Sequence, residues 1–224
     1  MIWRILVFSF LFVAPLASQI RVVNEGFPGQ NTAELDLHLE AALVRFRPEY
    51  VILFAGANDA LNEKKFLPAQ KTEAHLTSMV QHIQAHGAEA IMVTVHDPDL
   101  DRLMKRHKLV DYSDRPPLQR LKEVNLKIEQ VAASQHAKLV PFSQVLKQAG
   151  GADTELSTDG VHLTAKGYGL LARAVRDELA GNIPSDTVIL CFGDSLTYGI
   201  GVRPPNDAPE TSETYPAQLR ALLK

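Results

Sequence analysis

The chain has little cysteine, no stretch dominated by one charge and no internal repeat, and each absence excludes a class of protein. Cys191 is the only cysteine among 224 residues, so neither an internal disulfide nor a thiolate metal cluster can form. Lysine and arginine are scattered and the net charge is −3, so nothing favours a nucleic-acid partner. With 46% apolar and 22% charged residues, the composition is ordinary for one globular domain.

A long apolar run occurs only at the N-terminus. Residues 1–17, MIWRILVFSFLFVAPLA, contain one charged side chain, Arg4. Because the run is short for a membrane span, it predicts a secretory signal peptide, followed by a single domain over residues 18–224. The alternative is an apolar helix or strand of the folded domain. We therefore expect a secreted or periplasmic protein, otherwise a cytoplasmic one, with no stable membrane insertion after processing.

Beyond the N-terminus, short apolar segments alternate with helical patterns. The expected strands are 21–25, 50–55, 90–95, 138–142 and 187–192, and the expected helices are 31–46, 68–86, 118–135, 164–180 and 215–223. This alternation predicts an α/β fold with a five-stranded parallel sheet and helices on both faces. Residues 99–117 are charged and weakly patterned, and we expect a surface excursion or partial lid there.

The last apolar segment, residues 187–192, contains no charge, which favours a strand buried on both faces. Gly193 is expected to end it, and Asp194 and Ser195 follow. Ligands of open α/β sheets bind at the carboxyl ends of the strands, so Ser195 is a candidate nucleophile. The alternative is that Ser195 only caps a following helix.

Other polar residues are expected at the same edge of the sheet. Gly29 and Asn58 follow the first two strands, and Asp159 and His162 precede a helix. A histidine can take the proton of a serine hydroxyl, and an acidic group can fix its tautomer. The backbone N–H groups of Ser195 and Gly29 and the amide of Asn58 could stabilise an oxyanion. Taken singly, each residue could instead be a turn former, a helix cap or a surface side chain.

Four segments together resemble the SGNH hydrolase (GDSL esterase/lipase) family. They are Gly193-Asp-Ser-Leu196, Gly29 within Asn24-Glu-Gly-Phe-Pro-Gly29, Gly56-Ala-Asn-Asp59 and Asp159-Gly-Val-His162. The resemblance implies a three-layer α/β/α, flavodoxin-like fold. It also implies Ser195 as nucleophile, Asp159 and His162 as the rest of a triad, and Gly29 and Asn58 as oxyanion donors, with no metal and no organic cofactor.

The order of these segments departs from the family pattern, in which the serine block comes first. Here it comes last, so the chain is predicted to be circularly permuted, opened between the helix ending at Leu223 and the strand starting near Arg21. Residues 182–186 would then join the family's usual ends. A G-x-S-x-G motif is absent because Thr197 stands at its second glycine, which argues against an α/β-hydrolase.

The resemblance implies a small-molecule ester as substrate. Short-chain, acetyl-like esters are the favoured prediction, lysophospholipids or acyl thioesters are the alternative, and a non-catalytic carbohydrate- or lipid-binding module is the alternative from another class. The oligomeric state cannot be predicted.

The remaining histidines suggest two further hypotheses. His96 and Asp97 end a strand and are candidate substrate contacts, although a loop histidine is the simpler interpretation. His82 and His86 have metal-ligand spacing on the helix that carries His75, but no acidic third ligand stands out, so no metal site is predicted.

Overall fold

The computed structural model describes residues 19–112, 115–179, 181–206 and 208–224. The predicted signal peptide, residues 1–17, lies outside these ranges. A five-stranded parallel sheet forms the centre of the molecule, which confirms the predicted α/β fold. Its strands are β1 (Arg21–Gly26), β2 (Tyr50–Phe54), β3 (Glu89–Val93), β4 (Lys138–Val140) and β5 (Val188–Gly193), in the spatial order β1-β5-β2-β3-β4.

The last strand in sequence, β5, lies inside the sheet between β1 and β2. All of its side chains are buried, and Cys191 is in register with Asn24 on one side and Ile52 on the other. Gly193 is the last residue of β5, so the strand ends at the glycine that was predicted to end it. A Cβ atom at this position would lie 2.0 Å from the carbonyl oxygen of Phe54, so only glycine allows the strands to approach this closely.

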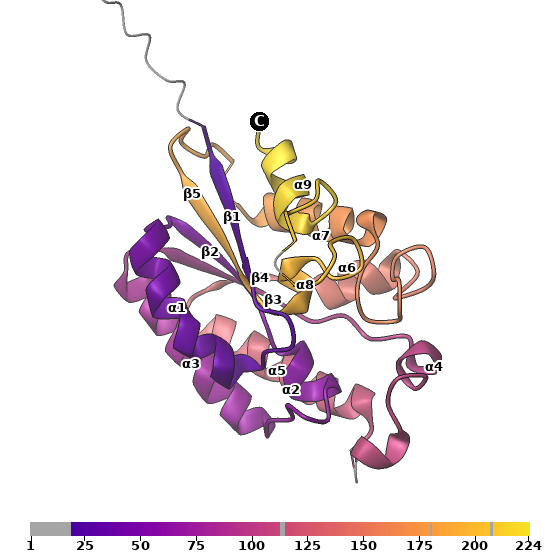
Figure 1. Cartoon of the computed structure of the whole chain (residues 1–224). Coiled ribbons are helices and arrows are strands. Elements are labelled where there is room, and N and C mark those ends of the chain that lie inside the picture. The colour runs from indigo at the N-terminus through magenta and orange to yellow at the C-terminus, as the bar shows by residue number, and fades with distance from the viewer. Residues whose placement is uncertain (1–18, 113–114, 180, 207) are drawn as a thin grey trace, which may run out of the picture.

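Helices cover both faces of the sheet (Figure 1). On one face lie α1 (Thr32–Phe46), α3 (Ala69–Ala85) and α5 (Pro117–Ser134), and on the other lie α6 (Phe142–Gln148), α7 (Ala165–Glu178) and α9 (Tyr215–Leu222). A capping box formed by Asn31 and Glu34 begins α1. Leu35, Leu39 and Leu43 of α1 are fully buried, because their spacing places them on one helical face.

Several short helices were not expected from the sequence. They are α2 (Ala57–Leu61), α4 (Leu100–Leu103), the 3₁₀ helix η1 (Leu109–Tyr112), α6 and α8 (Ser195–Tyr198). Such segments are too short to show an apolar repeat over two or more turns. Phe142, predicted to end a strand, instead begins α6, and its buried ring contacts the ring of Phe54 edge-on.

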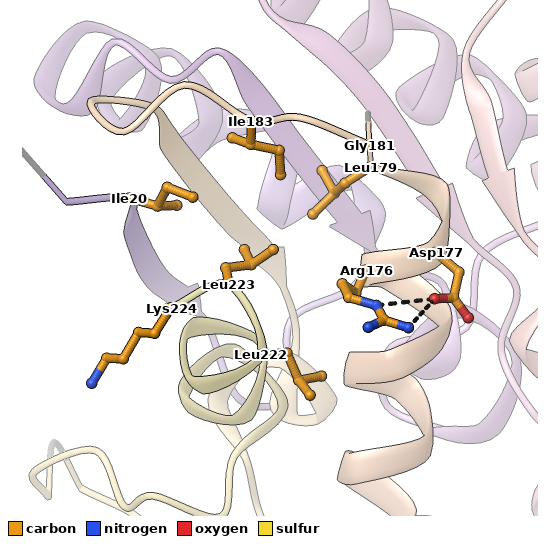
Figure 2. Close-up of a pocket in the computed structure, with 9 residues that line it drawn as sticks. All are labelled: Ile20, Arg176, Asp177, Leu179, Gly181, Ile183, Leu222, Leu223 and Lys224. Carbon is orange, nitrogen blue, oxygen red and sulfur yellow. Dashed lines mark hydrogen bonds and ion pairs between the residues drawn. The ribbon is translucent and has the colours of Figure 1, made fainter.

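The C-terminal helix ends beside the start of β1. Nη2 of Arg220 donates a hydrogen bond to the carbonyl oxygen of Val22 at 2.7 Å. Figure 2 shows Ile20, Ile183 and Leu223 around the hollow at this end, whose volume is about 500 Å³. Counted from β5, the strand order becomes 2-1-3-4-5, that of flavodoxin-like sheets. This arrangement fits the circular permutation, which stays a prediction.

The described part of the chain contains no helix with the length and apolar character needed to cross a membrane.

Candidate active site

Ser195 is the first residue of α8 and is separated from the end of β5 by Asp194 alone. The cap of α8 is Asp194, whose buried carboxylate accepts a hydrogen bond from the backbone N–H of Leu196 at 2.9 Å. Ser195 therefore does not act as the cap. Its Oγ instead lies 3.0 Å from Nε2 of His162.

The loop before α7 brings His162 and Asp159 together. Nδ1 of His162 lies 2.7 Å from Oδ2 of Asp159, while Oδ1 of Asp159 accepts hydrogen bonds from the backbone N–H groups of Val161 and His162 at 2.9 and 2.8 Å. Partial burial acts to raise the pKa of Asp159, but the hydrogen bonds and the charge of His162 outweigh it and hold the pKa well below its usual range. The carboxylate is thus ionised and oriented toward the imidazole.

Gly29 and Asn58 lie at the same pocket as Ser195 and His162. Gly29 has a φ of +78°, a backbone conformation that glycine adopts without strain. Nδ2 of Asn58 donates to the carbonyl oxygen of Gln30 at 3.0 Å, which holds its amide next to the turn that contains Gly29. The two predicted oxyanion donors are therefore side by side, although they come from different turns.

A buried carboxyl group, Asp59, holds these two turns together. It accepts hydrogen bonds from the backbone N–H of Thr32, at the start of α1, at 3.0 Å, and from Oγ1 of Thr72, in α3, at 2.9 Å. Burial raises the pKa of Asp59, and the hydrogen bonds partly offset this effect. Asp59 thereby fixes α2, which carries Asn58, against α1.

Asp194 is also fully buried, behind Ser195. Burial raises its pKa to about 7, against the opposing effect of the hydrogen bond from the N–H of Leu196. Nδ2 of Asn58 lies 3.4 Å from Oδ2 of Asp194. Asp159, which is bonded to His162, and Asp194, which precedes Ser195 in the chain, thus have pKa values moved in opposite directions.

The pocket in front of Ser195 has a volume of about 530 Å³. Its lining includes the apolar side chains of Leu61, Leu103, Val161 and Ile200 and the ionisable side chains of Glu63, Lys64, Arg106 and His107. Nδ1 of His107 is paired with Oε2 of Glu63 at 2.6 Å. The pocket thus offers both apolar contacts and polar partners to a small ester.

The structure does not bring His96 and Asp97 to this pocket, which corrects their predicted placement as substrate contacts. The side chain of His96 is buried, with Nε2 2.8 Å from the carbonyl oxygen of Val161. Burial lowers the pKa of His96 to about 4, so its ring is neutral at pH 7. Asp97 lines a separate polar groove with Lys122 and Lys147.

His75 of α3 and His86, the residue that caps the end of α3, have acidic partners from α1. His75 is paired with Asp36 at 3.0 Å, and His86 with Glu40 at 3.1 Å. Within the described ranges, no group of three or more His, Cys, Asp or Glu side chains is placed to hold a metal ion. Cys191 is fully buried, and burial raises the pKa of its thiol to about 12.

Sequence reasoning missed Arg106, which lines the pocket and contacts Asp159 through Nη1 at 2.7 Å. The only signal was the basic run Lys105-Arg-His-Lys108 within the charged excursion. Such a run more often forms a solvated surface, so a contact with the candidate triad could not be inferred from it.

A family model and a curated relative both match the chain. The model of the GDSL-like lipase/acylhydrolase family matches residues 8–170, which include the Gly29, Asn58 and Asp159–His162 segments and end before Ser195. Esterase TesA of Pseudomonas aeruginosa is 29% identical over 142 residues, 63% of this chain and 61% of the relative. The match thus spans about three-fifths of the relative's length.

Solved structures show the same fold. A lipase/acylhydrolase from Enterococcus faecalis superposes with a TM-score of 0.55 at 24% identity, over 66% of this chain and 69% of that one. A catalytic mutant of Axe2, an acetylxylan esterase from Geobacillus stearothermophilus, gives a TM-score of 0.56 at 21% identity, over 70% of each chain. At these identities the likeness extends to the fold alone.

Proposed function

The chain belongs to the GDSL-like lipase/acylhydrolase family, and from this premise we propose that it is a serine hydrolase of carboxylic esters. One observation carries the proposal: Oγ of Ser195 lies 3.0 Å from Nε2 of His162, whose Nδ1 lies 2.7 Å from Asp159. This chain of hydrogen bonds is the arrangement that turns a serine hydroxyl into a nucleophile.

In the proposed reaction, Oγ of Ser195 attacks the ester carbonyl carbon while Nε2 of His162 takes the hydroxyl proton. Asp159 stabilises the resulting imidazolium. The negative oxygen of the tetrahedral intermediate accepts hydrogen bonds from the backbone N–H groups of Ser195 and Gly29 and from the amide of Asn58. His162 then protonates the leaving alcohol, and an acyl-enzyme remains. Water, activated by His162, attacks this acyl group and releases the carboxylic acid.

We favour short-chain, acetyl-like esters as substrates. Axe2, which shares the fold, is an acetylxylan esterase, and the pocket has room for a small acyl group between its apolar walls. Lysophospholipids and acyl thioesters are the alternative substrates. A pocket of about 530 Å³ is within the range of small-molecule sites, so its volume does not separate these classes.

A non-catalytic carbohydrate- or lipid-binding module is the alternative from a different class. Such a module would have no need of a serine hydroxyl aligned with an imidazole. The short contacts of His162 with both Ser195 and Asp159 therefore disfavour this alternative.

Hydrolysis of p-nitrophenyl esters, from acetyl to dodecanoyl, tests the proposal. We expect turnover that is highest for the short acyl groups and nearly abolished in Ser195→Ala, with the fold retained. Ser78→Ala is a matched control, because this serine lies on α3 and its hydroxyl binds Asp36. Undiminished turnover in Ser195→Ala would refute the assignment, and a maximum at long acyl groups would refute the preference for short ones.

A further inference from the structure

One oxygen of the Asp159 carboxylate is shared between two donors. Oδ2 lies 2.7 Å from Nδ1 of His162 and also 2.7 Å from Nη1 of Arg106. Oδ1 is already occupied by the backbone N–H groups of Val161 and His162. The carboxylate that would stabilise a protonated imidazole is therefore divided between that imidazole and a permanently charged guanidinium.

Arg106 is held in this position by a second arginine one turn earlier. Nη1 of Arg102 donates to the carbonyl oxygen of Ser157 at 2.8 Å, and Nη2 donates to that of Ala152. Its Nε is paired with Oδ2 of Asp99 at 2.8 Å, and its side chain is only 15% exposed. Arg102 thus fastens the excursion to the loop that carries Asp159, so the contact of Arg106 with that residue is built into the fold.

The charge environment of His162 comes from several elements. The titratable and charged groups that surround it or line its pocket are Glu63, Lys64, His96, Arg106, His107, Asp159 and Asp194. Glu63 and His107 are paired with each other, and His96 is kept neutral by burial. Arg106 is the member of this set that places a permanent positive charge against the triad.

We propose that Arg106 is a positioning residue that opposes protonation of His162 by occupying part of the Asp159 carboxylate. A nearby positive charge disfavours a second one, so the imidazole remains a neutral base at lower pH than it would beside an undivided carboxylate. The inference rests on the proposed function for its kinetic consequence, while the ionisation of His162 itself can be measured without turnover.

The test compares the pH dependence of kcat/KM in the wild type, Arg106→Gln and Arg106→Lys. Without the guanidinium, the imidazolium gains an undivided carboxylate, so the acid limb of Arg106→Gln should shift upward by roughly 0.5 to 1 pH unit. The plateau at higher pH should change less than about fivefold, because the ion pair is partly exposed. Arg106→Lys keeps the positive charge, so its acid limb should stay within half of that shift.

Arg115→Gln is the matched control. Arg115 lies in the same excursion, is 42% exposed against 41% for Arg106, and pairs with a different carboxylate, Glu123, at 3.2 Å. The acid limb of the kcat/KM profile of Arg115→Gln should coincide with that of the wild type. Should Arg106→Gln fail to fold, Arg106→Met, which keeps most of the apolar stem, replaces it.

An activity-independent measurement separates this inference from the proposed function. The ring signals of His162, assigned by comparison with His162→Gln, are followed by NMR across the pH range and should show the same upward shift in Arg106→Gln. An unmoved acid limb and unmoved ring signals would overturn the inference, as would an equal shift in Arg106→Lys or Arg115→Gln. A shift of the ring signals without any ester hydrolysis by the wild type would support the inference and count against the proposed function.

Discussion

At the scale of single residues, the carboxyl groups of Asp159 and Asp194 show how the surroundings move the pKa of the same chemical group in opposite directions. Asp159 accepts hydrogen bonds from His162 and from backbone N–H groups, and its pKa is held well below the usual range. Asp194 is fully buried, and burial raises its pKa to about 7. Asp159 therefore remains ionised across the range in which an imidazole titrates, as a partner of His162 must.

Asn58 gives the residue-scale prediction. Asn58→Ala removes the one side-chain donor proposed for the oxyanion, so kcat should fall by about 10²–10³. The amide also binds the carbonyl oxygen of Gln30, so thermal unfolding must be measured alongside kcat to show that the fold survives. An unchanged kcat in the folded variant would remove Asn58 from the site.

The candidate triad could be identified from the sequence because each of its members lies in a short motif at an expected strand end or helix start. The tertiary contacts of individual side chains could not be predicted in this way. His96 lies just beyond the end of β3, yet its ring is buried against the Val161 carbonyl. Arg106 contacts Asp159 only because the excursion folds back onto the loop that carries Asp159. Both placements depend on contacts between residues far apart in the sequence.

At the scale of elements, glycine allows β5 and its neighbours to approach closely behind Ser195. A Cβ on Gly193 would lie 2.0 Å from the carbonyl oxygen of Phe54 and 2.5 Å from Oγ1 of Thr197. A Cβ on Gly26, at the end of β1, would lie 2.1 Å from the backbone nitrogen of Tyr198. The position of α8, and with it Ser195, therefore depends on these two glycines.

Gly193→Ala should destabilise the fold because the added methyl group collides with backbone that cannot move aside. We expect a loss of about 2–3 kcal/mol or more, seen as a fall in the thermal midpoint of roughly 5–10 °C. Gly181→Ala is the matched control, since its Cβ would meet nothing within 4 Å. Equal midpoints for the two variants would contradict the account of close packing.

Hydrophobic periodicity predicts the long helices and the strands of this protein but not its short helices. The five strands and the long helices were predicted from it to within a few residues, since each presents a clear apolar pattern. The short helices α2, α4 and α8 were missed, because a single turn carries no repeat. Two of them, α2 and α8, hold Asn58 and Ser195, so the site was identified from its motifs rather than from its secondary structure.

At the scale of the whole molecule, the sheet is assembled from segments whose order along the chain differs from their order in space. β5, at the C-terminal end, lies between β1 and β2, and α9 then returns to the start of β1, where Arg220 binds Val22. The site is defined by native contacts and not by the order of segments along the chain. A chain rearranged to place the serine segment first should therefore form the same fold and site.

A rearranged chain tests this prediction. It would run from Ser185 to Lys224, continue through a flexible linker to Gln19 and end at Ile183. Since the ends to be joined lie at the same end of the sheet, we expect a folded protein with esterase turnover within about tenfold of the original. Circular dichroism and p-nitrophenyl acetate hydrolysis measure the two properties. A rearranged chain that does not fold would contradict the prediction.

The central claim is that a hydroxyl, an imidazole and a carboxylate from distant segments act as one catalytic unit, and covalent labelling tests it most directly. The protein is treated with a p-nitrophenyl alkylphosphonate, and the modified peptide is identified by mass spectrometry. The account predicts one phosphonyl group per chain, located on Ser195, with labelling slowed strongly in His162→Gln. A label on any other residue, or labelling of Ser195 at the same rate in His162→Gln, would contradict it.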